Sequence, residues 1–163
     1  MKKKNQIYSD DFGVNLNRAL RFLSFRPRSE KEIRDYFKKK QVDPLVSQKI
    51  IDKLRESKFL NDMEFARWWV EQRTLIKPRA WRIIKIELKQ KGISSEIIEE
   101  LNINSESEEI NDLTMAIKLA QRRLPRYKSL SRQEIYQKMG RFLISKGFDY
   151  DTIKRSIDRI LKS

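Results

Sequence analysis

Two short basic sequences, 51 residues apart, are the parts of this chain best suited to bind an anion. Arg26–Arg28 and Lys77–Arg79 each place one cationic side chain on either side of a proline. Guanidinium and ammonium groups donate hydrogen bonds to phosphate oxygens. We interpret the two sequences as equivalent parts of one phosphate-contacting surface. The alternative interpretation is a set of solvated side chains near helix ends.

Other cations at the ends of expected helices extend this surface, and one tryptophan joins them. Trp68 and Trp69 are consecutive, so they cannot share one face of a helix. We expect one ring to pack inward and the other to be exposed, where it could stack on a base or a partner side chain. The alternative is that both rings pack in the core or between repeats. The candidate partner- or DNA-binding residues are Arg26, Arg28, Arg73, Lys77, Arg79, Arg82, Lys89, Lys91, Arg122, Arg123, Arg126 and Trp68.

The overall charge favours a polyanionic partner. The 163 residues carry a formal net charge of +14, and self-repulsion of that size is relieved by binding an anionic polymer such as nucleic acid. The chain has no Cys and no His, which excludes disulfides, Cys/His zinc sites and Cys or His nucleophiles. It has no Gly-rich phosphate loop and no nucleophile elbow. We therefore expect no enzyme activity, no cofactor and no metal.

The sequence shows no targeting or membrane segment. The basic start, residues 1–5, leads into the polar run Tyr8–Asp11 rather than into an apolar stretch. No run approaches the ~20 apolar residues that a membrane-spanning helix needs. We expect a cytoplasmic protein.

An internal repeat organises the basic positions. A shift of 51 residues takes Ile33 to Ile84, Phe37 to Leu88 and Gln41 to Gly92, and a further shift of 55 takes these to Met139, Leu143 and Gly147. Upstream, Ala19, Leu23 and Arg26 parallel Ala66, Val70 and Arg73, and then Ala116, Ala120 and Arg123. Repeats of this length are typical of stacked helical units.

Local signals predict three helices in each repeat. Ser29 with Glu32, and Ser131 with Glu134, form capping boxes that begin second helices. Gly92 and Gly147 lie where a helix C-terminus needs a left-handed residue. Apolar residues recur at helical spacing after each of these positions. The sequence therefore predicts an all-α fold of three tandem three-helix repeats.

The expected boundaries follow from the repeats and from an acidic stretch. Residues 102–112 contain four acidic residues and no basic one, which is typical of a polar linker. The expected segments are 1–15 as a mobile N-terminal segment, 16–58 as repeat 1, 59–101 as repeat 2, 102–112 as an acidic linker and 113–163 as repeat 3.

The order and spacing of several sequences resemble those of the RecX family of bacterial regulators. They are Leu23–Glu30, Phe59–Ala66, Trp69–Arg73, Glu87–Ile93 and Arg141–Phe148, and the likeness runs from about residue 16 to 161. Gln41 departs from the family pattern, which has glycine after the second helix of repeat 1.

The resemblance implies an elongated, curved array of three-helix repeats. It also implies a monomeric, cytoplasmic modulator of the RecA recombinase with no enzyme activity. Such proteins bind in the groove of the RecA–DNA filament and inhibit its extension, strand exchange, ATPase and co-protease activities in DNA repair. Direct contact with single-stranded DNA stays open.

Two other functions fit the same residues. Three-helix units resemble helix-turn-helix domains, so the chain could bind duplex DNA directly. A solenoid groove could instead recognise an acidic protein in the absence of nucleic acid.

Overall fold

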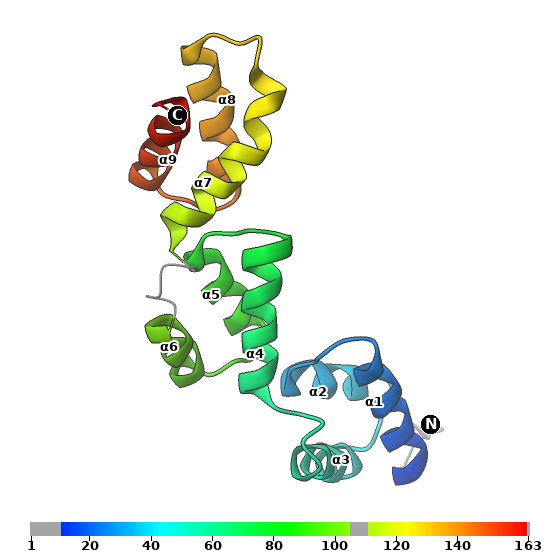
Figure 1. The fold of residues 1–163 in the computed structure, drawn as a ribbon. Coiled ribbons are helices and arrows are strands. Elements are labelled where there is room, and N and C mark those ends of the chain that lie inside the picture. Colours follow the sequence, from blue (N-terminus) through cyan, green and yellow to red (C-terminus); the bar gives the residue numbers. More distant parts are fainter. Residues whose placement is uncertain (1–10, 105–110, 163) are drawn as a thin grey trace, which may run out of the picture. The chain divides into compact units, whose positions relative to one another are not determined.

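The computed structural model describes residues 11–104 and 111–162, and every regular element in these residues is helical (Figure 1). The α-helices are α1 (Phe12–Ser24), α2 (Glu30–Lys39), α3 (Pro44–Glu56), α4 (Asp62–Glu71), α5 (Trp81–Gln90), α6 (Ser95–Asn104), α7 (Asp112–Arg123), α8 (Arg132–Ser145) and α9 (Tyr150–Lys162). A π-helical turn, Gln72–Ile76, continues α4, and a 3-10 turn, Leu124–Tyr127, continues α7. The predicted all-α fold of three three-helix repeats is confirmed.

The chain divides into two compact units. Unit 1 comprises the described residues up to Trp68 together with Lys91–Ile93, and unit 2 comprises Trp69–Gln90 with the described residues from Ser94 onwards. The boundary therefore falls inside repeat 2 rather than between repeats. None of the described helices is long and apolar enough to cross a bilayer.

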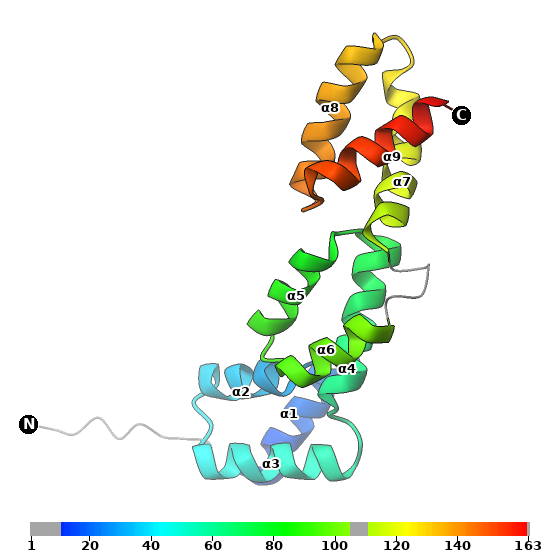
Figure 2. The same ribbon diagram turned by 90° about the vertical axis from the view of Figure 1, so that its left-hand side faces the viewer.

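Each unit has its own apolar core. In unit 1, α3 packs against α1 and α2, and in unit 2 the helices α7, α8 and α9 pack against one another (Figure 2). The unit 1 core is built from Ala19, Ile33, Phe37, Val42, Ile50, Ile51, Leu54 and Leu60. The unit 2 core is built from Ala80, Met115, Ala116, Leu119, Ala120, Met139, Leu143, Phe148, Ile153, Ile157 and Ile160.

The predicted capping boxes start α2 and α8. The Ser29 hydroxyl accepts a hydrogen bond from the Glu32 amide at 3.2 Å, and the Glu32 carboxylate accepts one from the Ser29 amide at 3.3 Å. Ser131 and Glu134 make the same reciprocal pair. These contacts satisfy amides that have no acceptor within the first helical turn.

Three of the expected boundaries differ from the observed helices. Asp11 caps α1, which begins at Phe12 and buries Asn15, so residues 12–15 belong to the first helical unit and not to a mobile segment. Within the expected acidic linker, α6 extends to Asn104 and α7 begins at Asp112. Residues 1–10 and 105–110 lie outside the described residues, and the other boundaries stay predictions.

A carboxylate caps the second helix in each unit from a distant part of the sequence. In unit 1, Asp62 Oδ1 accepts a hydrogen bond from the Glu30 amide at 2.8 Å. In unit 2, Asp112 Oδ1 accepts one from the Trp81 amide at 2.8 Å. Each aspartate is the first residue of the helix that opens the next sequence repeat. Burial raises the pKa of both carboxyl groups, against the effect of these backbone hydrogen bonds.

Besides the aspartate caps, a second contact occurs in both units: a glycine lies close to a side chain of the second helix. Gly92 and Gly147 have φ angles of +80° and +94°, the left-handed conformation predicted for them. A Cβ on Gly92 would lie 2.7 Å from the Lys31 Cβ, and one on Gly147 would overlap the Ile83 side chain. Gln41 takes the equivalent left-handed conformation in repeat 1, with φ of +54°. The glycines are therefore needed for close packing as well as for the turn.

We predict that Gly147→Ala destabilises the protein, because alanine is strained at this φ and its methyl group would overlap Ile83. The expected loss is about 1–3 kcal/mol. Gly140, in the middle of α8, has no neighbouring atom within 4 Å of an added Cβ, so Gly140→Ala should instead stabilise by about 0.5–1 kcal/mol. Urea unfolding of both variants measures the difference. Equal stability of Gly147→Ala and the parent chain would contradict the packing role.

Candidate nucleic-acid interface

Arg26, near the end of α1, is held by contacts within unit 1. It donates two hydrogen bonds to the Glu32 carboxylate, at 2.8 and 3.0 Å. Its guanidinium lies 5.6 Å from the ring centre of Trp68. Lys91 reaches the same carboxylate, with Nζ 2.7 Å from Glu32 Oε1. Two candidate cations therefore share one acid, and Trp68 packs against one of them.

The pKa of the Glu32 carboxyl group reflects its interactions with these two cations. Burial alone would raise its pKa, but the hydrogen bonds and charges of Arg26 and Lys91 outweigh burial and lower the pKa to about 2. Its side chain is 13% exposed, so solvent screens the two contacts little. Glu32 thus stabilises unit 1 in its ionised form.

Arg73 makes the equivalent arrangement in unit 2. Its Nε donates to Glu87 Oε2 at 2.6 Å, and its guanidinium lies 4.6 Å from the ring centre of Trp69. The Trp69 indole N–H donates to the same Glu87 oxygen at 2.9 Å. Trp68 and Trp69 are both half-buried, so the expected division into one buried and one exposed ring is not observed.

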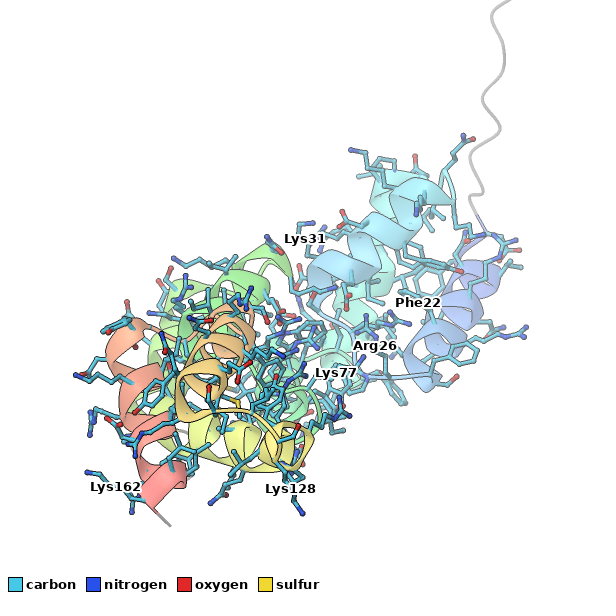
Figure 3. All side chains as sticks on the ribbon, turned by 90° about the horizontal axis from the view of Figure 1, so that it is seen from above. Phe22, Arg26, Lys31, Lys77, Lys128 and Lys162 are labelled. Carbon is cyan, nitrogen blue, oxygen red and sulfur yellow. The ribbon has the colours of Figure 1, made fainter. Side chains whose placement is uncertain are left out.

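Arg28 is half-buried against an aromatic ring of unit 1. Its guanidinium lies 3.8 Å from the ring centre of Phe22, and its Nε donates to the Phe22 carbonyl at 3.4 Å. Burial and the nearby charge of Arg26 lower its pKa. Phe22 and Arg26 are labelled on unit 1 in Figure 3.

Arg79 and Arg82 connect the start of α5 to the end of α8 and to the loop that follows it, all within unit 2. Arg79 donates to the Ser145 carbonyl at 3.0 Å, and Arg82 donates to the Gly147 carbonyl. Between them, the Ala80 amide donates to the Lys146 carbonyl at 3.0 Å. The predicted basic sequence Lys77–Arg79 therefore contributes to packing, and replacing Arg79 would test stability together with binding.

The third basic cluster lies at the end of α7. Arg123 donates to the Tyr127 hydroxyl at 2.8 Å, and its guanidinium lies 4.1 Å from the ring centre of Phe142. Arg122 and Arg126 flank it and are exposed. With Leu119 and the Phe142 ring, the three arginines line a shallow hollow on unit 2.

Four candidate cations are exposed and have no ion pair or hydrogen-bonded side-chain partner among the described residues. We call them the open cations: Lys77, Lys89, Arg122 and Arg126. Lys77 is labelled on unit 2 in Figure 3, and so is Lys128, which follows the third basic cluster in the sequence. The described part of the chain contains no group of three or more acidic side chains that could hold a metal ion.

The acidic partners were not visible in the sequence. Glu32 was predicted as a capping residue, but its contact with Lys91 spans 59 residues of sequence. Asp62 and Asp112 carried no local signal beyond preceding an expected helix. The contact between Arg73 and Glu87 depends on how the turn after α4 packs against α5. Sequence spacing does not predict that packing.

Three family models match the chain in order along its length. They describe the first, second and third three-helix domains of RecX, and they match residues 16–54, 61–101 and 110–157.

Curated proteins and solved structures agree with these models. The chain is 37% identical over 153 residues to a regulatory protein RecX of Bacillus subtilis, covering 94% of this chain and 57% of that protein. It is 37% identical over 139 residues to one of Listeria welshimeri, covering 85% and 51%. The chain thus spans about half the length of the curated relatives it matches. A crystal structure of RecX from Lactobacillus salivarius aligns with a TM-score of 0.74 at 26% identity, covering 93% of this chain and 97% of that one.

We predict that Glu32→Gln destabilises the protein at neutral pH by roughly 2–3 kcal/mol, since one pKa unit corresponds to about 1.4 kcal/mol. The pKa of Glu32 is lowered from its ordinary value of 4.5 to about 2. Its contribution is therefore complete above pH 4.5 and is lost as the pH falls towards 2. Urea unfolding of parent and variant between these pH values measures the change.

Glu56→Gln is the matched control, because Glu56 is exposed at the end of α3. It should change the free energy of unfolding by less than about 0.5 kcal/mol. A difference between parent and Glu32→Gln that stays constant from pH 7 to pH 3 would contradict the ion-pair role.

Proposed function

Because this chain belongs to the RecX family, we propose that it binds the RecA–DNA filament and inhibits the recombinase, ATPase and co-protease activities of RecA. It would do so by binding alone, without catalysis, in the cytoplasm. Membership of a family of regulatory proteins carries the proposal. The charge of the chain supports it.

The excess of basic over acidic residues favours a polyanionic partner. The chain has 37 Lys and Arg against 23 Asp and Glu, so a large excess of cations remains even if every acid is paired. A RecA–DNA filament presents phosphates at regular intervals, and each phosphate contact releases bound counterions. Cations that already hold the protein together are less available for this purpose than the open cations. We therefore propose Lys77, Lys89, Arg122 and Arg126 as the first contacts.

Within unit 2, these contacts would be positioned mainly by Arg73, Arg79, Arg82 and Arg123. The remaining candidates, Arg26, Arg28, Lys91 and Trp68, would act mainly by stabilising unit 1. The side chains of both sets hold carboxylates, carbonyl oxygens or aromatic rings of the chain. A protein built in this way presents its cations from ordered backbone in and beside helices, which lowers the entropy lost on binding.

We predict that the protein lowers the DNA-dependent ATPase rate of the cognate RecA on single-stranded DNA. The measurement is the steady-state rate of ATP hydrolysis as the protein is titrated against preformed filaments. Inhibition far below one protein per RecA would indicate action at filament ends, and inhibition near equivalence would indicate binding along the filament. An unchanged rate at excess protein would contradict the proposed inhibition.

We also predict that the double variant Lys77→Ala/Lys89→Ala binds the filament more weakly and with less dependence on salt. Loss of two phosphate contacts should reduce the slope of log affinity against log salt concentration by about 1 to 2. Fluorescence anisotropy of labelled filaments across a salt series measures both quantities.

The matched control is Lys49→Ala/Lys118→Ala, which removes the same charge from two other exposed lysines. It should leave the slope close to that of the parent chain. Equal slopes for both double variants would remove Lys77 and Lys89 from the interface. Binding to naked duplex DNA as tight as binding to the filament would instead support a direct DNA-binding protein.

A further inference from the structure

A groove between α8 and α9 of unit 2 has an unusual apolar surface. The two helices pack against each other in the described structure (Figures 1 and 2). The groove floor contains Ile153 and Ile157, which are 5% and 0% exposed. Its walls carry Ile144 and Tyr150, which are 60% and 78% exposed. Two large apolar side chains thus face solvent beside an apolar floor, an arrangement that commonly marks a binding surface.

A glycine keeps this groove open. Gly140 lies in the middle of α8 and lines the groove. Glycine inside a helix is unfavourable relative to alanine. Gly140 needs no left-handed backbone, and an added Cβ would meet no atom within 4 Å. Neither backbone nor packing within the described residues therefore accounts for glycine at this position, whereas an occupant of the groove would.

The rim of the groove is basic. Arg141 and Lys154 line it and are exposed, and neither makes an ion pair among the described residues. The acids nearby on α9 have other partners. Asp158 accepts a hydrogen bond from the Tyr136 hydroxyl, and Asp151 pairs with Arg155 at 3.4 Å. The groove thus offers two unpaired cations above an aliphatic floor.

We propose that this groove binds a peptide segment of a protein partner that carries acidic residues beside apolar ones. An apolar ridge of such a peptide would cover the exposed side chains of Ile144 and Tyr150, above the buried Ile153 and Ile157, in the way that amphipathic helices enter grooves between helices. Its carboxylates would pair with Arg141 and Lys154. The lining combines three isoleucines, Ile144, Ile153 and Ile157, with the rings of Tyr136 and Tyr150. Bases would gain from stacking on the two rings alone, so the aliphatic share of the lining favours a peptide over nucleic acid. None of these residues belongs to the proposed filament contacts, so the inference stands independently of the proposed function.

Selection from a random-peptide phage library on the immobilised full chain tests the proposal. We expect enriched sequences that combine Asp or Glu with large apolar residues. The strongest of these peptides, labelled with fluorescein, is then titrated with variants of the full chain. Gly140→Leu fills the groove and should weaken binding by tenfold or more, the size of a typical hot-spot effect of about 1.4 kcal/mol or above. Gly140→Ala adds only one methyl group and should weaken binding by a smaller amount, about threefold. Gln133→Leu, at an exposed position of α8 outside the groove lining, is the matched control and should bind within about twofold of the parent.

A second variant tests the contribution of the two cations at the rim of the groove. Arg141→Gln/Lys154→Gln should weaken the peptide and remove most of the salt dependence of its binding. Circular dichroism and thermal unfolding show whether each variant keeps its helices, and Gly140→Leu should unfold no earlier than the parent. Failure to enrich any peptide, enrichment of peptides without acidic residues, or equal binding to Gly140→Leu would overturn the proposal. The groove would instead be assigned to nucleic acid by two results together. A single-stranded oligonucleotide would displace the peptide, and Gly140→Leu would weaken the binding of that oligonucleotide.

Discussion

The first amide of a helix has no acceptor within the helix, and the structure of both units depends on where α2 and α5 find one. A carboxylate supplies it in each unit, Asp62 for the Glu30 amide and Asp112 for the Trp81 amide. Because each aspartate is also the first residue of the helix that opens the next repeat, α4 or α7, one hydrogen bond connects successive repeats. Gly92 and Gly147 then allow the backbone to approach the same second helices closely. The same two contacts therefore occur in both units: an aspartate that caps the second helix, and a glycine whose backbone lies close to that helix. Together they determine the local packing.

This construction uses a large share of the charged side chains. Glu32 and Glu87 bind Arg26, Lys91 and Arg73. Carbonyl oxygens at the end of α8 and just after it bind Arg79 and Arg82. Charged side chains that are partly buried must be paired to offset their lost hydration. Glu32 and Glu87 are thus neutralised within the units, and the excess of Lys and Arg over Asp and Glu leaves cations such as Lys77 and Arg122 exposed.

The helices were predictable because their signals are local. Ser29 and Ser131 precede their glutamates by three residues, and Gly92 and Gly147 follow the last turn of a helix. The repeat alignment placed Arg26, Arg73 and Arg123 at equivalent positions, and each does lie against an aromatic ring. The roles of the candidate cations were not predictable in the same way. Whether an arginine faces solvent or a carbonyl 66 residues away, as Arg79 does, depends on tertiary packing that no spacing reveals. The groove beside Gly140 was missed for the same reason, since a glycine inside a helix carries no sign of what it leaves open.

The candidate cations of this chain fall into two groups, one that holds each unit together and one that is exposed and available to a polyanion. Acetylation of lysines with and without RecA–single-stranded DNA filaments, followed by peptide mass spectrometry, tests this division residue by residue. The account predicts that the filament protects Lys77 and Lys89 from modification, while Lys91, bound to Glu32, reacts slowly in both conditions. Unchanged reactivity of Lys77 and Lys89 in the presence of saturating filament would contradict it.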